Sequence, residues 1–143
     1  MKWIRNILAS LGWILAVPAI IYAFASFQPY QYAKPENPMP SVETIKSIRF
    51  IESTSKSNAE FIIPTNDFPM VSLLFAGSRK DSKPSKWVFF GDLYVDLLDC
   101  DTVRFELYTT HKSTGAFKTG EQYYRGGIDE QFKSVLTKYI SNK

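Results

Sequence analysis

This chain of 143 residues contains one cysteine and one histidine. A single cysteine excludes an internal disulfide, so the folded part must be stabilised by its hydrophobic core. A zinc site takes three or four ligands from cysteine, histidine and carboxylates. One cysteine and one histidine in the whole chain argue against such a site. The sequence therefore predicts no metal site.

Sequence motifs of common catalytic and nucleotide-binding sites are also missing. There is no glycine-rich phosphate loop, no Gly-x-Ser-x-Gly elbow and no His-Glu-x-x-His. The net charge is +3, and Lys2 and Arg5 supply two of these charges. The rest of the chain is nearly neutral, whereas nucleic-acid binding needs clustered positive charge. We expect no cofactor, no catalytic residue and no nucleic-acid partner.

At its N-terminal end the chain has a long run without charge. The apolar part, from Ile7 to Phe27, holds 21 residues, of which Tyr22 is the one with an ionisable side chain. As a helix it would measure roughly 30 Å, the thickness of the hydrocarbon core of a bilayer. Lys2 and Arg5 precede it, which favours a cytoplasmic N-terminus. The run predicts a signal-anchor or transmembrane helix over residues 1–27 of a single-pass inner-membrane protein, with the remainder periplasmic.

A cleaved signal peptide is the alternative for the same run. Ala23-Phe24-Ala25 has the small-residue pattern that signal peptidase recognises, and cleavage after Ala25 would release a secreted periplasmic protein. The length of the run favours the retained anchor, because secretory apolar regions usually span about 7–15 residues.

Proline and alternating patterns divide the rest of the chain. Four prolines in residues 28–40 predict an extended stalk. Residues 41–143 then predict one extracytoplasmic α+β domain: a small antiparallel sheet with a C-terminal amphipathic helix packed on one face. The apolar stripe of that helix follows the spacing i, i+4, i+7, i+8, i+11 and i+12, at Ile128, Phe132, Val135, Leu136, Tyr139 and Ile140.

Within this domain the apolar/polar pattern predicts four main strands and an inner helix. Strands are expected over residues 45–52, 59–64, 87–97 and 103–107, with Gly91 as a bulge and one further strand over 117–124. Residues 68–76 read as a buried helix or a core strand. Asn66, Asp67, Pro69 and Gly77 are suitable cap residues and favour the helix. Residues 78–86 read as a solvated loop.

Three groups of residues could carry chemistry, and each has a simpler explanation. His111 could act as a general base but reads as a loop residue. Cys100 lies between two aspartates that oppose thiolate formation, so we interpret it as a turn residue. Asp92, Asp96, Asp99 and Asp101 miss the spacing of a calcium loop, and aspartates are common in turns.

Two short stretches are the candidate contact residues. Tyr123, Tyr124 and Arg125 join adjacent aromatics to a guanidinium, and these residue types are enriched at interaction hot spots. Arg79 and Lys80 belong to a basic loop that could touch an acidic partner or anionic lipid.

The function predicted from the sequence is a membrane-anchored extracytoplasmic protein-interaction module. Its partners would be the membrane and another envelope protein, as an envelope assembly component or as an inhibitor or immunity-type protein. The alternative is a small envelope enzyme or ligand-binding domain. That alternative requires a concave pocket with convergent polar groups and a perturbed titratable residue.

Overall fold

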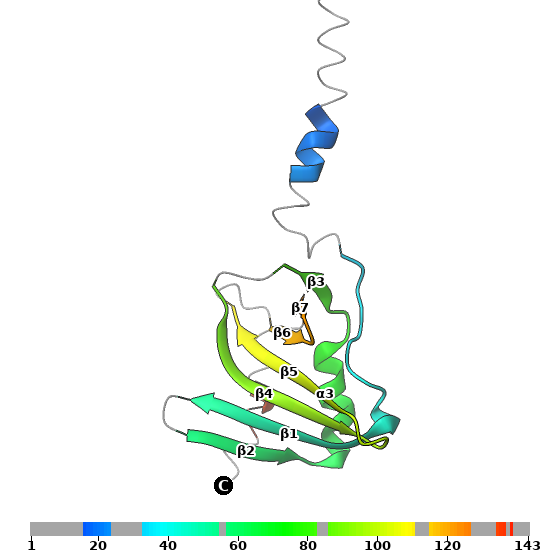
Figure 1. Cartoon of the computed structure of the whole chain (residues 1–143), viewed down its shortest axis with the longest axis vertical. Coiled ribbons are helices and arrows are strands. Elements are labelled where there is room, and N and C mark those ends of the chain that lie inside the picture. Colours follow the sequence, from blue (N-terminus) through cyan, green and yellow to red (C-terminus); the bar gives the residue numbers. More distant parts are fainter. Residues whose placement is uncertain are drawn as a thin grey trace, which may run out of the picture.

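An antiparallel sheet of seven strands dominates the part of the chain that the structure describes (Figure 1). The structure is a computed structural model, and it describes residues 16–23, 33–54, 57–82, 86–110, 115–126, 134–136 and 138. The strand order is β2-β1-β4-β5-β6-β7-β3. In chain order the strands are β1 (Ile45–Thr54), β2 (Ser57–Ile63), β3 (Arg79–Asp81), β4 (Val88–Leu97), β5 (Thr102–Thr109), β6 (Ala116–Thr119) and β7 (Gln122–Arg125).

The helices of the described residues are short. Two 3₁₀ turns, η1 (Val42–Thr44) and η2 (Thr65–Asp67), precede β1 and the helix α3 (Phe68–Phe75). Proline in the first turn of α3 suits the helix because its missing N–H has no helical partner there. The chain leaves α3 at Gly77, whose φ of 73° is a left-handed conformation that glycine adopts without strain.

No helix of the described residues is long and apolar enough to cross a membrane. Within the uncharged run, the described residues 16–23 are helical. The prediction of a transmembrane, single-pass protein is therefore wrong on this finding. Residues 1–15 and 24–32 lie outside the described part.

The predicted α+β class with a small sheet is also corrected. The sheet is larger than expected and the helices are minor. Two features account for the difference: β3 lies inside the expected loop, and the expected strand over 117–124 is a hairpin of two strands. Of the predicted C-terminal helix, residues 134–136 are helical and Leu136 is buried in the core; the remainder, apart from Lys138, lies outside the described residues.

The core lies between one face of the sheet, called the inner face here, and α3. Alternate residues of the central strands point into it, because side chains in a strand alternate between the two faces. Phe75 of α3 packs on Phe105 and Phe117, with ring centroids 4.7 and 4.8 Å apart. The fully buried inner-face residues include Ile48, Phe50, Leu93, Val95, Phe105, Leu107 and Phe117.

A bulge in β4 sets which aromatic residues reach the opposite side, called the outer face. The register with β5 shifts between Phe89 and Gly91. Phe90 consequently packs against the core, whereas Phe89 pairs with Tyr108 on the outer face. Glycine is required here, since a Cβ on Gly91 would lie 2.6 Å from the carbonyl oxygen of Ile51. The bulge predicted at Gly91 is confirmed.

Candidate interaction surface on the outer face of the sheet

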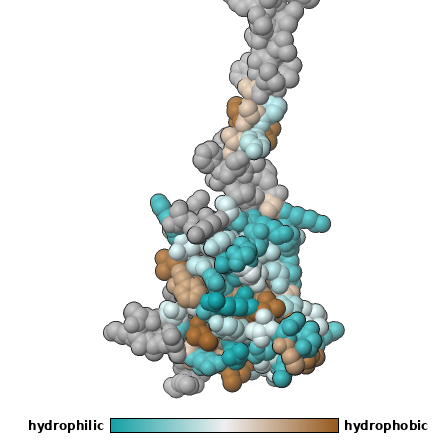
Figure 2. All heavy atoms as spheres, viewed as in Figure 1, coloured by the Kyte–Doolittle hydropathy of each residue, from teal (hydrophilic) through white to brown (hydrophobic). Residues whose placement is uncertain are grey.

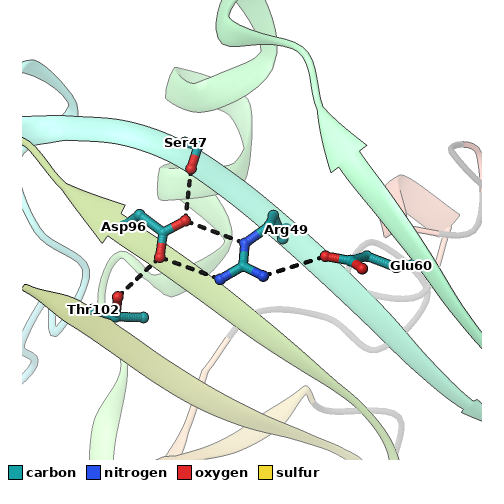
Figure 3. Close-up of polar contacts among 5 residues, drawn as sticks. All are labelled: Ser47, Arg49, Glu60, Asp96 and Thr102. Carbon is teal, nitrogen blue, oxygen red and sulfur yellow. Dashed lines mark hydrogen bonds and ion pairs between the residues drawn. The ribbon is translucent and has the colours of Figure 1, made fainter. Parts of the chain in front are cut away.

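The outer face carries polar side chains over most of its area. Figure 2 shows hydrophilic residues over much of the surface and separate apolar patches, one of them near the start of β4. In Figure 3 the polar side chains lie on the near side of the strands and α3 lies on the far side. Two arrangements of residues make up this face.

The first arrangement, the charged network, centres on the carboxylate of Asp96 (Figure 3). The Arg49 guanidinium donates to it through Nε at 3.2 Å and through Nη2 at 3.3 Å. The Ser47 hydroxyl donates at 2.7 Å and the Thr102 hydroxyl at 2.9 Å. A third nitrogen of Arg49 reaches Glu60 at 3.3 Å. The register aligns Ser47, Asp96 and Thr102 on three neighbouring strands, so the sheet itself positions these groups.

These contacts lower the pKa of Asp96 to about 2. The hydrogen bond from Ser47 contributes most, followed by that from Arg49, because both stabilise the ionised carboxylate. A carboxylate with this pKa is a weak base at neutral pH, and both of its oxygens already accept hydrogen bonds. Asp96 is therefore suited to holding the strands together rather than to acid–base catalysis.

Beside the network lies a shallow cavity of about 250 Å³. Its lining includes Lys46, Ser47, Asp96 and Cys100. Cys100 is exposed and has a φ of 73°, so it is a turn residue, as the sequence predicted. Asp96, which lines the cavity together with Asp101, is held by its own hydrogen-bond donors and is not available as a base for the thiol.

The acidic residues singled out in the sequence do not gather into a metal site. Asp92 accepts two hydrogen bonds from Arg104, at 3.0 and 3.1 Å. Asp99 accepts the backbone N–H of Asp101 at 3.2 Å, the turn role expected of it. In the described ranges no group of three histidine, cysteine or acidic residues could hold a metal ion. His111 lies outside the described residues.

The second arrangement is the aromatic cluster, formed by Trp87, Phe89, Tyr108 and Tyr123. Ring centroids are 5.8 Å apart between Trp87 and Tyr108, 6.1 Å between Trp87 and Tyr123, and 5.7 Å between Phe89 and Tyr108. These tilted and edge-on contacts are the favourable geometry for aromatic pairs. Phe89 is 37% exposed, so the cluster meets solvent.

Two cations lie over the rings of this cluster. The Lys118 ammonium is 5.7 Å from the Tyr123 ring centroid, and the Arg125 guanidinium is 5.4 Å from that of Trp87. Arg125 is anchored by an ion pair of 2.6 Å with Asp81. The cluster therefore joins aromatic surface to positive charge on the solvent side of the sheet.

Tyr108 links the aromatic cluster to the charged residues of the sheet. Its hydroxyl donates to Glu106 at 2.6 Å. Burial and the neighbouring Glu106 carboxylate raise the pKa of Tyr108 well above its ordinary value. The phenol therefore stays protonated at neutral pH and serves as a fixed hydrogen-bond donor.

The structure brings the two predicted contact stretches together but divides them between the faces. β3 pairs with β7, which places Arg79 opposite Arg125 and Lys80 opposite Tyr124. Tyr123 belongs to the aromatic cluster, and the Arg125 guanidinium lies over its Trp87 ring. Tyr124 is instead buried, stacked on Phe117 with centroids 5.2 Å apart, and burial raises its pKa.

Lys80 shares the side of Tyr124 and forms an ion pair of 3.1 Å with Glu36. Lys80 and Tyr124 are thus structural residues of the β3 edge.

Sequence reasoning missed Trp87, Phe89, Tyr108 and Lys118 as surface residues. Uninterrupted alternation over residues 87–97 would place Trp87 and Phe89 on the same face as the core residue Leu93. The signal that could have separated them is the predicted bulge at Gly91, because one extra residue reverses the faces of the residues before it.

Comparisons with protein-family models, with curated proteins and with solved structures find no match to this chain.

Proposed function

We propose that this domain is a non-catalytic module that binds another protein through the aromatic cluster. The observation that carries this proposal is the contact of four aromatic rings on the side of the sheet opposite α3. Tryptophan, tyrosine and arginine are the residue types most enriched at binding hot spots. Phe89, 37% exposed, brings part of this aromatic surface into contact with solvent.

The neighbouring charged residues support the proposal because they hold the surface in one conformation. Tyr94 lies between the guanidinium groups of Arg49 and Arg104, whose carbons are 5.4 and 6.0 Å from its ring centroid. Both arginines are also bound by carboxylates of the sheet. A surface already fixed in the free protein loses less conformational entropy when a partner binds.

The alternative of a small enzyme or ligand-binding domain receives less support. It calls for a concave site with a titratable group available for chemistry. The cavity beside Asp96 is shallow, and its carboxylate is engaged by Ser47, Arg49 and Thr102. A protein-binding surface requires neither a concave site nor a free titratable group, and the aromatic cluster of the outer face is suited to it.

The proposed location is outside the cytoplasm, and it is argued from the sequence. Lys2 and Arg5 precede the uncharged run, and the small-residue tripeptide ends at Ala25. In that setting the module would serve as a component of an envelope assembly or as an inhibitor or immunity-type protein.

Site-specific photocrosslinking in the native cells tests the binding surface. A photoreactive phenylalanine derivative replaces Phe89, which belongs to the aromatic cluster and is 37% exposed, and in a control chain it replaces Leu73 of α3, which is 72% exposed. We expect one defined protein adduct from position 89 and none from position 73. Trp87→Ala or Tyr123→Ala should weaken the adduct strongly, since loss of a hot-spot ring costs about 2 kcal/mol or more of binding.

Two results would overturn the proposal. One is an adduct of equal yield from positions 73 and 89. The other is an adduct at position 89 that does not change when Trp87 and Tyr123 are replaced while the chain keeps its circular dichroism spectrum.

A further inference from the structure

The two edges of the sheet differ in how well they are protected against pairing with another strand. β3 is three residues long and carries Lys80. Just before it, the backbone N–H of Glu36 donates to the carbonyl of Ser78 at 2.7 Å, so another part of the chain covers that end. Short length, lysine and a covering segment are known means of protecting a sheet edge.

The β2 edge has none of these devices. β2 is seven residues long and pairs with β1 in an unbroken register from Ile63 to Ser57, without a bulge. It contains no proline and no lysine, and its one charge, Glu60, is bound by Arg49. Within the described residues, no strand pairs with its other side. Such an edge offers its backbone N–H and C=O groups to an incoming strand.

The exposed side chain of Ile62 makes the unpaired β2 edge energetically unfavourable. It is 74% exposed, and it lies on the outer face, directly opposite Arg49. Burial of an isoleucine side chain is worth about 1.5–3 kcal/mol, so covering Ile62 would add to the hydrogen bonds of a new strand pair.

We propose that the β2 edge is a dimer interface at which two copies of this chain pair antiparallel about a two-fold axis. The charge on β2 excludes one register. A two-fold axis at Glu60 would place two carboxylates directly opposite each other, which is destabilising. An axis at Phe61 places each Glu60 opposite Ile62 of the second copy and each Ala59 opposite Ile63. The apolar and polar faces of the two sheets then continue into each other.

A second copy fits better than an unrelated strand because the edge is self-complementary in this register. Each copy covers the exposed Ile62 of the other, and each Glu60 keeps its own Arg49 as counter-ion. The interface is isologous and closes after two copies, so it does not extend into a fibre. It is also separate from the aromatic cluster, which belongs to β4, β5, β7 and the residue before β4.

Disulfide crosslinking of the full chain in its native cells tests both the pairing and the register. In a Cys100→Ser background, chains with Glu60→Cys and chains with Ile62→Cys carry different tags and are expressed together. Opposed residues in a strand pair are close enough for a disulfide. We expect oxidation to link the two tags, with at least about tenfold more mixed dimer than a matched Leu73→Cys pair gives.

A second measurement covers the case in which the cysteine variants disturb the edge. Ile62→Lys should weaken self-association of the purified full chain by about tenfold or more, while Leu73→Lys leaves it unchanged. Sedimentation velocity reports the mass, and circular dichroism confirms folding. A mixed-dimer yield equal to the Leu73→Cys control, a disulfide to a different protein, or a dimer that persists in Ile62→Lys would overturn the proposal.

Discussion

Asp96 receives four hydrogen bonds from three side chains, and a large part of the polar order of the outer face depends on it. Its pKa is lowered to about 2, so the folded state binds its proton less readily than the unfolded state does. Linkage then requires that Asp96 stabilise the fold above its ordinary pKa, and that this contribution disappear as the pH falls through about 2.

We expect Asp96→Asn to destabilise the protein at pH 7 by about 1–2 kcal/mol, since the side chain is 24% exposed and its ion pair is partly screened. The difference in free energy of unfolding between wild type and variant should shrink from pH 5 to pH 2. Urea denaturation at pH 7, 4 and 2 measures it, with the exposed Asp101→Asn as control. An equal loss at pH 7 and pH 2 would contradict the role assigned to Asp96.

At the scale of elements, α3 is held by one of its sides alone. Phe75 lies between two core rings, whereas Leu73 is 72% exposed on the same helix. Phe75→Ala should cost about 3–5 kcal/mol through lost burial and a cavity, and Leu73→Ala should stay within about 0.5 kcal/mol. Chemical denaturation compares the two, and similar losses for both would show that α3 does not pack as described.

The same elements show what the sequence could reveal. The strands over 45–54, 88–97 and 102–109 carry long apolar alternation, and α3 is bounded by suitable cap residues, so both were predictable. β3 consists of Arg-Lys-Asp and has no alternation that could be recognised. Its strand conformation depends on pairing with β7, a contact 44 residues away for Arg125 and Asp81. The same pairing of β3 with β7 sets the neighbours of Tyr123 and Tyr124, which lie opposite Asp81 and Lys80.

At the scale of the whole molecule, the two faces of the sheet have different surroundings and residue types. The inner face packs on α3 and Leu136, and the outer face presents fixed charges and the aromatic cluster. A sequence pattern identifies which residues alternate between the two faces. For the residues of β4 before Gly91, however, the bulge decides which face each side chain occupies. The aromatic cluster could therefore be assembled only once strand order and register were known.

The single cysteine offers a test of where the whole domain resides. Cys100 is exposed in the β4–β5 turn, and its thiol is accessible to a reagent in solution. If the domain lies outside the cytoplasm, as we propose, a maleimide that cannot cross membranes should label Cys100 in intact spheroplasts as fully as in lysed cells. A mass shift on a denaturing gel measures the labelling, with Cys100→Ser as the unlabelled control and a cytoplasmic thiol protein as the permeability control. Labelling that requires lysis would place the domain in the cytoplasm and would exclude envelope proteins as partners of the aromatic cluster.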